Sequence, residues 1–153
     1  MLILLFHVGE DLYAIESSRV VEVIPRVPLR KIHHISDYVP GSFNYRGSIV
    51  PVIDLCHLIQ GVPSRSHLST RIIMVKSSQE NITLPFLGLM AERIIHTLNK
   101  SDNDFVNSHV QMSQAPYLGG MILDKNGMIQ QIHLEELFAD AQRFYLSVAG
   151  EQK

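Results

Sequence analysis

The 153-residue chain has one cysteine and no tryptophan, and neither charge sign predominates. The single cysteine, Cys56, excludes an internal disulfide and fits a reducing compartment. The formal net charge of -2 gives no support for a nucleic-acid or anionic-membrane partner. The densest basic stretch, around residues 19 to 34, is interleaved with Glu16 and Glu22 and lacks alternating aromatics. We therefore expect no nucleic-acid binding.

Long hydrophobic runs are also lacking. The apolar stretch near the N-terminus ends at His7 and has no basic region before it, so it does not match a signal peptide. No run approaches the roughly 20 residues that a membrane-spanning helix needs. The composition, 46% hydrophobic and 18% charged, is typical of one ordered globular domain. We expect a cytoplasmic protein with no direct membrane insertion.

Motifs of catalysis and metal binding are missing as well. The chain contains no G-x-S-x-G, Walker or G-x-G-x-x-G motif. Cys56 and His57 are neighbours, and in an extended chain they would point to opposite faces and could not form a nucleophile-base pair. The histidines show no H-x-x-x-H or H-x-H spacing. We expect no enzyme activity, no cofactor and no metal; a small enzyme or metal protein, with His57 and His67 as ligands, is the remote alternative.

Short segments of alternating hydrophobicity, separated by turn residues, make up most of the chain. Only the C-terminus predicts a helix, because apolar residues recur there at helical spacing. These two features predict an all-β barrel or sandwich with one terminal helix. The expected strands are 2–8, 12–15, 20–24, 48–55, 71–76, 82–90, 94–98, 121–123 and 128–134, with hairpin turns at 9–11 and 124–127, a polar loop at 99–114, and a helix whose apolar stripe is Leu134, Leu137, Phe138, Ala141 and Tyr145.

The stretch "GSFNYRGSIVPVIDL", residues 41 to 55, has two unusual features. Apolar side chains occupy both faces of the strand, which predicts that both faces are covered. Pro51 cannot donate to a sheet ladder, which predicts an edge strand or a bulge, and Pro85 predicts the same for its strand. Asp54 at the strand end is expected to act as a cap or turn acceptor. Arg46 is presented at a turn, where exposure to solvent and contact with a partner remain equally open.

The chain also contains a weak internal echo. Gly47-x-Ile49 leading to Ile53-Asp54-Leu55 is similar to Gly127-x-Ile129 leading to Ile132-His133-Leu134, one residue shorter. Two such units would suit a pair of small stacked barrels, although chance similarity between glycine turns is an open alternative.

The segment "VPGSFNYRGSIVPVIDL" resembles the signature of the CheW-like coupling proteins of bacterial chemosensory systems, roughly G-x-x-N-L-R-G-x-[IV]-x-P-[VI]-[IV]-D-L. Four further segments resemble other parts of that family in the same order, so the resemblance covers nearly the whole chain: "FHVGEDLYAIESSRVVEVI", "TRIIMV", "LGLMAERIIHTL" and "YLGGMILDKNGMIQQIHLEELF". Two positions depart from the signature, because Tyr45 replaces the usual leucine and Cys56 stands where an arginine commonly follows.

The resemblance implies an all-β fold of two packed SH3-like five-stranded β-barrels with a short C-terminal helix, in which residues 1–153 form a single CheW-like domain. It implies a non-catalytic scaffold that couples the cytoplasmic tip of methyl-accepting chemoreceptors to the regulatory domain of a CheA-type histidine kinase, with recruitment to membrane-bound receptor arrays. Because Tyr45 and Cys56 depart from the pattern, the alternative is a kinase-binding regulatory module of a surface-sensing, twitching or cyclic-di-GMP pathway that does not itself bind a receptor.

Site residues follow from the resemblance position by position. The family binds the receptor tip in a groove between the barrels and the kinase at the barrel ends. Asp54 matches a residue that supports the turn after its strand, and Ile94 is the expected kinase contact. The residues expected to line or support the receptor-facing side are Val20, Glu22, Asn44, Arg46 and Gly47.

Overall fold

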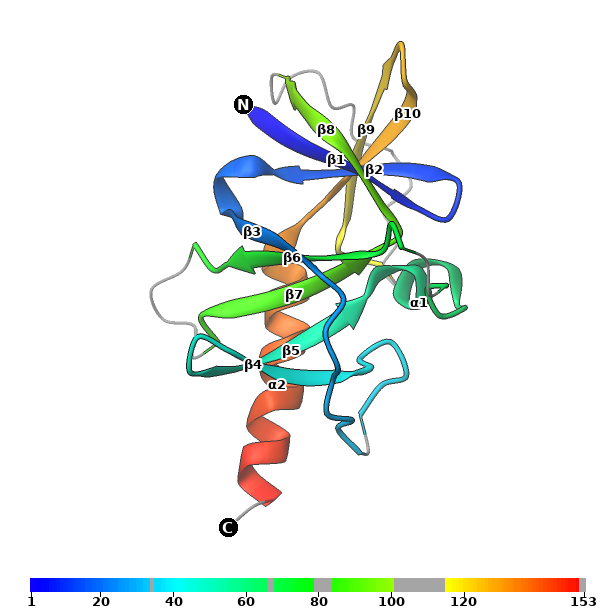
Figure 1. The fold of residues 1–153 in the computed structure, drawn as a ribbon. Helices are drawn as coiled ribbons and strands as arrows, with labels where there is room; N and C mark the ends of the chain where they lie inside the picture. The colour runs from blue at the N-terminus through cyan, green and yellow to red at the C-terminus, as the bar shows by residue number, and fades with distance from the viewer. Residues whose placement is uncertain (34, 66–67, 79–83, 101–114, 152–153) are drawn as a thin grey trace.

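The computed structural model describes residues 1–33, 35–65, 68–78, 84–100 and 115–151, with side chains up to residue 143. Within these ranges the chain forms mainly β-strands (Figure 1). The elements are β1 (Leu2–Val8), β2 (Asp11–Glu16), the 3-10 turn η1 (Ser17–Arg19), β3 (Val20–Pro25), β4 (Gly41–Tyr45), β5 (Ser48–Asp54), α1 (Leu55–Gln60), β6 (Arg71–Lys76), β7 (Phe86–Ala91), β8 (Arg93–Asn99), β9 (Leu118–Asp124), β10 (Gly127–Ile132) and α2 (Leu134–Glu151).

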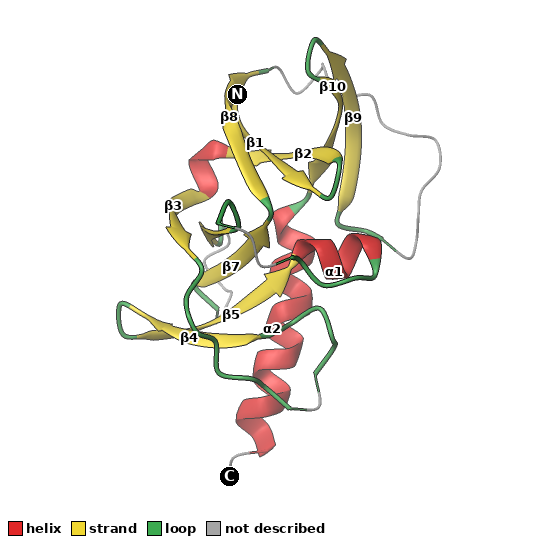
Figure 2. Ribbon diagram, turned by 45° about the vertical axis from the view of Figure 1, so that its right-hand side comes forward, coloured by secondary structure: helices red, strands yellow, loops and turns green. Residues whose placement is uncertain are grey.

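The strands form two five-stranded sheets with the same pairing pattern. The first sheet has the order β8-β1-β2-β10-β9, and the second has the order β3-β6-β7-β5-β4. All pairs are antiparallel except β10 with β2 in the first sheet and β5 with β7 in the second. Figure 1 shows the first sheet above the second, with α2 running down beside the second sheet, and Figure 2 shows the same arrangement turned by 45°, with the helices in red. The predicted all-β fold with two five-stranded units and a C-terminal helix is confirmed.

The two halves correspond most closely in the hairpins β4–β5 and β9–β10. Tyr45 pairs with Ser48 across one turn, and Asp124 pairs with Gly127 across the other. Leu55 and Leu134 then begin α1 and α2 at the same spacing from Ser48 and Gly127. The sequence echo had matched Gly47 with Gly127, which left the second copy one residue shorter. The structure matches Ser48 with Gly127, and in this alignment the two copies have the same length. In this register Ile53 matches Ile132 and Leu55 matches Leu134, whereas the other two matches of the echo, Gly47 with Gly127 and Ile49 with Ile129, are out of register by one residue.

Hydrophobic side chains form three clusters. The central cluster lies between the sheets and combines Phe6 and Ile15 of the first sheet with Ile73 and Leu89 of the second and Phe138 of α2. Two smaller clusters lie within the individual sheets. Burial of this apolar area holds the sheets and α2 together. The predicted apolar stripe of the C-terminal helix is buried as far as its side chains are described, namely Leu134, Leu137, Phe138 and Ala141.

Strand β5 confirms one prediction and contradicts another. Both faces are covered from Val50 onward, because Val50 and Val52 pack in the second sheet's cluster and Ile53 packs in the central cluster, whereas Ile49 near the start of the strand is exposed. The edge-strand or bulge prediction for Pro51 is wrong, since β5 lies between β7 and β4 and its pairing with β4 is regular. The parallel ladder with β7 begins only at Val52, so the absent N–H of Pro51 leaves no pair of that ladder incomplete.

Other element boundaries also differ from the prediction. Leu55 was expected to end a strand but begins α1, because Asp54 caps the helix and Gly61, with φ 79, ends it in the left-handed conformation. Pro85 lies before β7 and outside any strand. Residues 82–83 of the predicted strand 82–90, and residues 101–114 of the predicted loop, lie outside the described residues. The side chain of Tyr145 also lies outside the described part.

Candidate functional site

The turn between β4 and β5 presents Arg46 to solvent. Arg46 and Gly47 have φ 51 and φ 89, so both lie in the left-handed region that a two-residue hairpin turn favours. Asn44 stabilises the turn, because its Oδ1 accepts a hydrogen bond from Gly47 N at 2.9 Å. Within the described ranges Arg46 is the only non-glycine residue with positive φ. An arginine therefore occupies a position where glycine or asparagine would be less strained.

Glu22 of β3 connects this turn to the opposite edge of the second sheet. Tyr45 Oη donates to Glu22 Oε1 at 2.7 Å, and Arg46 Nη2 lies 3.3 Å from the same oxygen. The Arg46 guanidinium also lies over the Tyr45 ring, 5.1 Å from its centroid. We call Glu22, Asn44, Tyr45, Arg46 and Gly47 the turn cluster. Because β3 and β4 are the first and last strands of the sheet order, the cluster brings two sheet edges together.

A backbone bridge supports the same approach of the two edges. Arg30, which follows β3 along the chain, exchanges two hydrogen bonds with Ser42 of β4, at 2.8 and 2.9 Å. The second sheet is therefore curved so that its two edge strands approach each other, and this curvature brings Glu22 of β3 into contact with Tyr45 of β4.

Tyr45 anchors the turn cluster in the core. Its ring is buried and contacts Phe43 and Phe86 edge-on, with centroids 6.0 and 5.5 Å away. Burial, and next the hydrogen bond to Glu22, raise the pKa of the Tyr45 hydroxyl above its ordinary value. The hydroxyl therefore remains a hydrogen-bond donor at neutral pH.

The structure brings together most of the predicted receptor-facing residues. Glu22, Asn44, Arg46 and Gly47 belong to the turn cluster. Val20 starts the same strand as Glu22 but is half-buried and packs against the central cluster.

Ile94, the predicted kinase contact, lies apart on β8 of the first sheet, where it is half-buried against the central cluster. Sequence reasoning missed two exposed apolar side chains on the strands of the turn cluster, Ile49 and Val23, which are 64% and 39% exposed.

Asp54 organises the segment that follows β5. Its Oδ1 accepts from the backbone N–H of Cys56 at 3.1 Å and of His57 at 3.4 Å, which caps α1. Its Oδ2 accepts from Ser64 N at 2.8 Å, and Ser64 Oγ donates to Oδ1. One buried carboxylate therefore fixes both the start of α1 and the loop after it.

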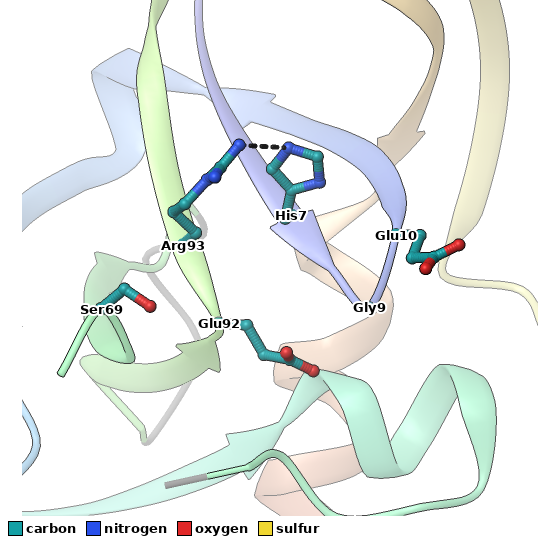
Figure 3. A pocket seen from close by; sticks show the side chains of 6 residues that line it. All are labelled: His7, Gly9, Glu10, Ser69, Glu92 and Arg93. Atoms are coloured by element: carbon teal, nitrogen blue, oxygen red, sulfur yellow. Dashed lines mark hydrogen bonds between the residues drawn. The ribbon is translucent and has the colours of Figure 1, made fainter. Parts of the chain in front are cut away.

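A polar pocket lies where the first sheet meets the start of β6 (Figure 3). Arg93 and His7 join across it, with Arg93 Nη2 3.2 Å from His7 Nε2. Burial, and then the neighbouring Arg93, hold the pKa of His7 below its ordinary value. Two carboxylates, Glu10 and Glu92, and one guanidinium, Arg93, line the pocket, so its lining is acidic on balance. No nucleophile-base pair is formed by the residues that line it.

The structure gives Cys56 a packing role. Cys56 is 3% exposed, and burial, followed by a hydrogen bond with Glu92, raises the pKa of its thiol to about 12. Such a thiol is a poor nucleophile at neutral pH. In the described ranges, no three metal-ligating side chains gather into a site. His67, half of the alternative metal pair, lies outside those ranges.

Arg19 is a structural residue that sequence reasoning did not single out. It is buried at the end of η1 and contacts α2, which starts more than a hundred residues later. The sequence places it in a basic stretch typical of a solvated face, so no local signal distinguished it.

The fold and the turn cluster define a module of two five-stranded β-sheets with polar side chains presented at one turn. The CheW-like domain model matches residues 2–142 of the chain. The chain therefore belongs to the CheW-like domain family.

Several known proteins are similar to the chain. Chemotaxis protein CheV3 of Helicobacter pylori is 33% identical over 85 residues, 56% of this chain and 27% of that protein. The chain thus spans only about a quarter of CheV3. Chemotaxis protein CheW of Treponema pallidum is 28% identical over 148 residues, 90% of this chain and 81% of that protein.

A solved structure has the same fold. TtCheW of Thermoanaerobacter tengcongensis, described as a scaffolding protein, superposes with a TM-score of 0.74 at 25% identity, covering 87% of this chain and 84% of that one. In the part of this chain that the structure describes, no helix has the length and apolar character needed to cross a membrane.

Proposed function

We propose that the chain is a non-catalytic adaptor that couples methyl-accepting chemoreceptors to a CheA-type histidine kinase. Membership of the CheW-like family supports the adaptor class. The observation that carries the receptor contact is the exposure of Arg46, whose side chain is 65% exposed although the turn holds it in a strained conformation. A strained, exposed and charged residue at a turn suits recognition better than packing.

The receptor side of the adaptor is the turn cluster with its apolar neighbours. Arg46 provides guanidinium N–H groups for carboxylate or carbonyl acceptors of a helical receptor tip. Ile49 and Val23 provide exposed apolar area on the strands beside it. Apolar contacts supply attraction in such a surface, while the charged groups set register and specificity. Val20 supports the strand that carries Glu22.

The kinase side lies on the first sheet. Ile94 on β8 is half-buried, so a partner would contact only part of its side chain. In this proposal residues 1–153 act as one CheW-like domain made of two barrels, and each barrel offers a different surface. The protein would work in the cytoplasm at membrane-bound receptor arrays, where many weak contacts gain strength from multivalency.

Charge reversal at Arg46 tests the receptor contact. Arg46→Glu is expected to leave the fold intact and to abolish pull-down by a soluble fragment carrying the helical tip of a methyl-accepting chemoreceptor. Circular dichroism and thermal unfolding check the fold. Lys125→Glu, in the matching turn of the β9–β10 hairpin, is the control and should retain binding. Unchanged pull-down by the Arg46 variant would remove the turn cluster from the receptor interface.

The second candidate is a kinase-binding regulatory module that does not itself bind a receptor. The ion pair between Arg46 and Glu22 favours it, because the pair neutralises much of the charge that a receptor would meet. Co-sedimentation with receptor-containing membranes separates the two functions. An adaptor sediments without kinase, whereas the regulatory module sediments only when the CheA-type kinase is added.

A further inference from the structure

The hydroxyl group of Tyr45 has a role that packing does not require. The ring fills the second sheet's cluster between Phe43 and Phe86, and a phenylalanine ring would fill the same space. The hydroxyl reaches beyond the cluster to Glu22 Oε1 at 2.7 Å. A hydrogen bond from a hydroxyl to a carboxylate is among the stronger kinds in proteins. The hydroxyl therefore fixes the position of a charged group on the neighbouring strand.

Arg46 is held by the same two residues. Its Nη2 lies 3.3 Å from Glu22 Oε1, and its guanidinium lies over the Tyr45 ring at 5.1 Å. An exposed ion pair by itself gains little, because two long side chains lose freedom to form it. Here the buried Tyr45 side chain contacts both Glu22 and Arg46, so one arrangement of these two side chains is favoured over the others.

We propose that Tyr45 is a positioning residue that determines which partner the turn cluster accepts. It holds Glu22 and Arg46 side by side, so that the cluster presents a carboxylate next to a guanidinium. The side chains remain accessible, Arg46 at 65% and Glu22 at 37% exposure. The matching partner surface is a helix that offers an acceptor next to a donor, such as a carboxylate side chain beside an amide. This inference rests on the proposed adaptor function and deepens it.

Two physical effects give the arrangement its selectivity. Side chains that are already ordered lose less entropy when a partner docks, so the partner that fits binds more tightly. A purely acidic surface is disfavoured, because Glu22 repels it while Arg46 attracts it. Without the Tyr45 hydroxyl, only the exposed ion pair with Arg46 would hold Glu22, and both effects would weaken.

A double-mutant cycle on binding tests the proposal. Tyr45→Phe, Glu22→Ala and the double variant are titrated calorimetrically with a soluble fragment carrying a chemoreceptor tip. Tyr45→Phe is expected to weaken binding about tenfold, since it removes a hydrogen bond to a charged acceptor. In the Glu22→Ala background the same change is expected to have no further effect, because the hydroxyl acts through Glu22. In the unbound protein, nitrogen relaxation of the Arg46 side chain should show increased mobility in Tyr45→Phe.

Tyr117→Phe is the matched control. It removes another buried tyrosine hydroxyl, 3.4 Å from the carbonyl of Leu58 and away from the turn cluster, and should leave affinity unchanged. Unfolding of every variant is measured in parallel. Two results would show that the positioning role is wrong while the adaptor function stands, provided that the wild type binds. In the first, Tyr45→Phe binds as tightly as the wild type. In the second, Tyr45→Phe loses the same affinity whether Glu22 is present or replaced. If wild type binds no receptor tip, the adaptor function fails and the positioning role fails with it.

Discussion

Arg19 and Glu135 form an ion pair that joins η1 to the first turn of α2, with Nη1 2.5 Å from Oε1. Through Nε, Arg19 also donates to the carbonyl of Lys76 at 2.9 Å, and its guanidinium lies 5.9 Å from the ring centroid of Phe138. Ser78 Oγ donates to the same Glu135 oxygen at 2.8 Å. One buried arginine thus ties the C-terminal helix to the end of β6.

Truncating Arg19 is expected to destabilise the protein more than neutralising its partner. Arg19→Ala should lower the free energy of unfolding by about 2–3 kcal/mol, because it removes buried stem packing and two hydrogen bonds. Glu135→Gln should cost only about 1 kcal/mol, because the Glu135 side chain is 41% exposed. Urea denaturation measures both. Arg19→Met, which keeps the stem, should fall between them; equal losses for Arg19→Ala and Glu135→Gln would contradict the assigned role.

Substitutions of Asp54 are expected to have graded effects, because Oδ1 accepts from the α1 backbone and from Ser64 Oγ, whereas Oδ2 accepts from Ser64 N. Asp54→Asn keeps Oδ1 as a cap for α1 but replaces the oxygen that accepts from Ser64 N. Asp54→Ala removes both and should lower the free energy of unfolding by about 2–3 kcal/mol, with the asparagine variant losing less. Equilibrium denaturation gives the values, and hydrogen exchange at Cys56 and His57 reports fraying of α1 directly. Identical losses for the two variants would mean that the contacts of Oδ1, the α1 cap and the Ser64 Oγ bond, contribute nothing.

Much of the fold could be predicted because its causes are local. Two apolar segments on either side of the turn residues 9–11 identified the β1–β2 hairpin, and the helical spacing of Leu134 to Ala141 placed their side chains on the buried face of α2. Helix α1 could not be predicted by periodicity, since its six residues are too short for a repeating pattern. Its only signals are Asp54 at the start and Gly61 at the end. The edge-strand or bulge prediction for Pro51 was wrong because the sequence does not reveal where a parallel ladder begins.

The candidate site could be predicted only where local sequence determines it. The exposure of Arg46 follows from its turn, which residues 44 to 47 encode locally. The contact between Tyr45 and Glu22 depends on how two sheet edges curve toward each other, and no local pattern encodes that curvature. Arg19 was missed because its partner Glu135 is distant in sequence.

Arg46→Gly is expected to abolish binding of the receptor tip without lowering the stability of the fold. Glycine releases left-handed backbone strain of about 1–2 kcal/mol, which offsets the lost ion pair and ring contact, together about 1 kcal/mol. Thermal unfolding should therefore show no loss, while receptor-tip binding disappears. Lys125→Gly is the matched control, because Lys125 holds the corresponding turn position without positive φ and should lose about 0.5–1 kcal/mol. A comparable loss in both variants would contradict the strain at Arg46.

His7 should make stability depend on pH below neutrality. Burial, and then Arg93, lower its pKa in the folded protein from 6.5, so the unfolded chain binds a proton at a higher pH than the folded one. The stability that the neutral form of His7 contributes is fully present above about pH 6.5. It is lost as the pH falls from there toward the pKa of His7 in the folded protein. Urea denaturation between pH 8 and 5 should therefore show a decline that His7→Gln reduces. His96→Gln, at an exposed position of the adjacent strand β8, is the control and should keep the wild-type decline; an unchanged decline in His7→Gln would show that another group causes it.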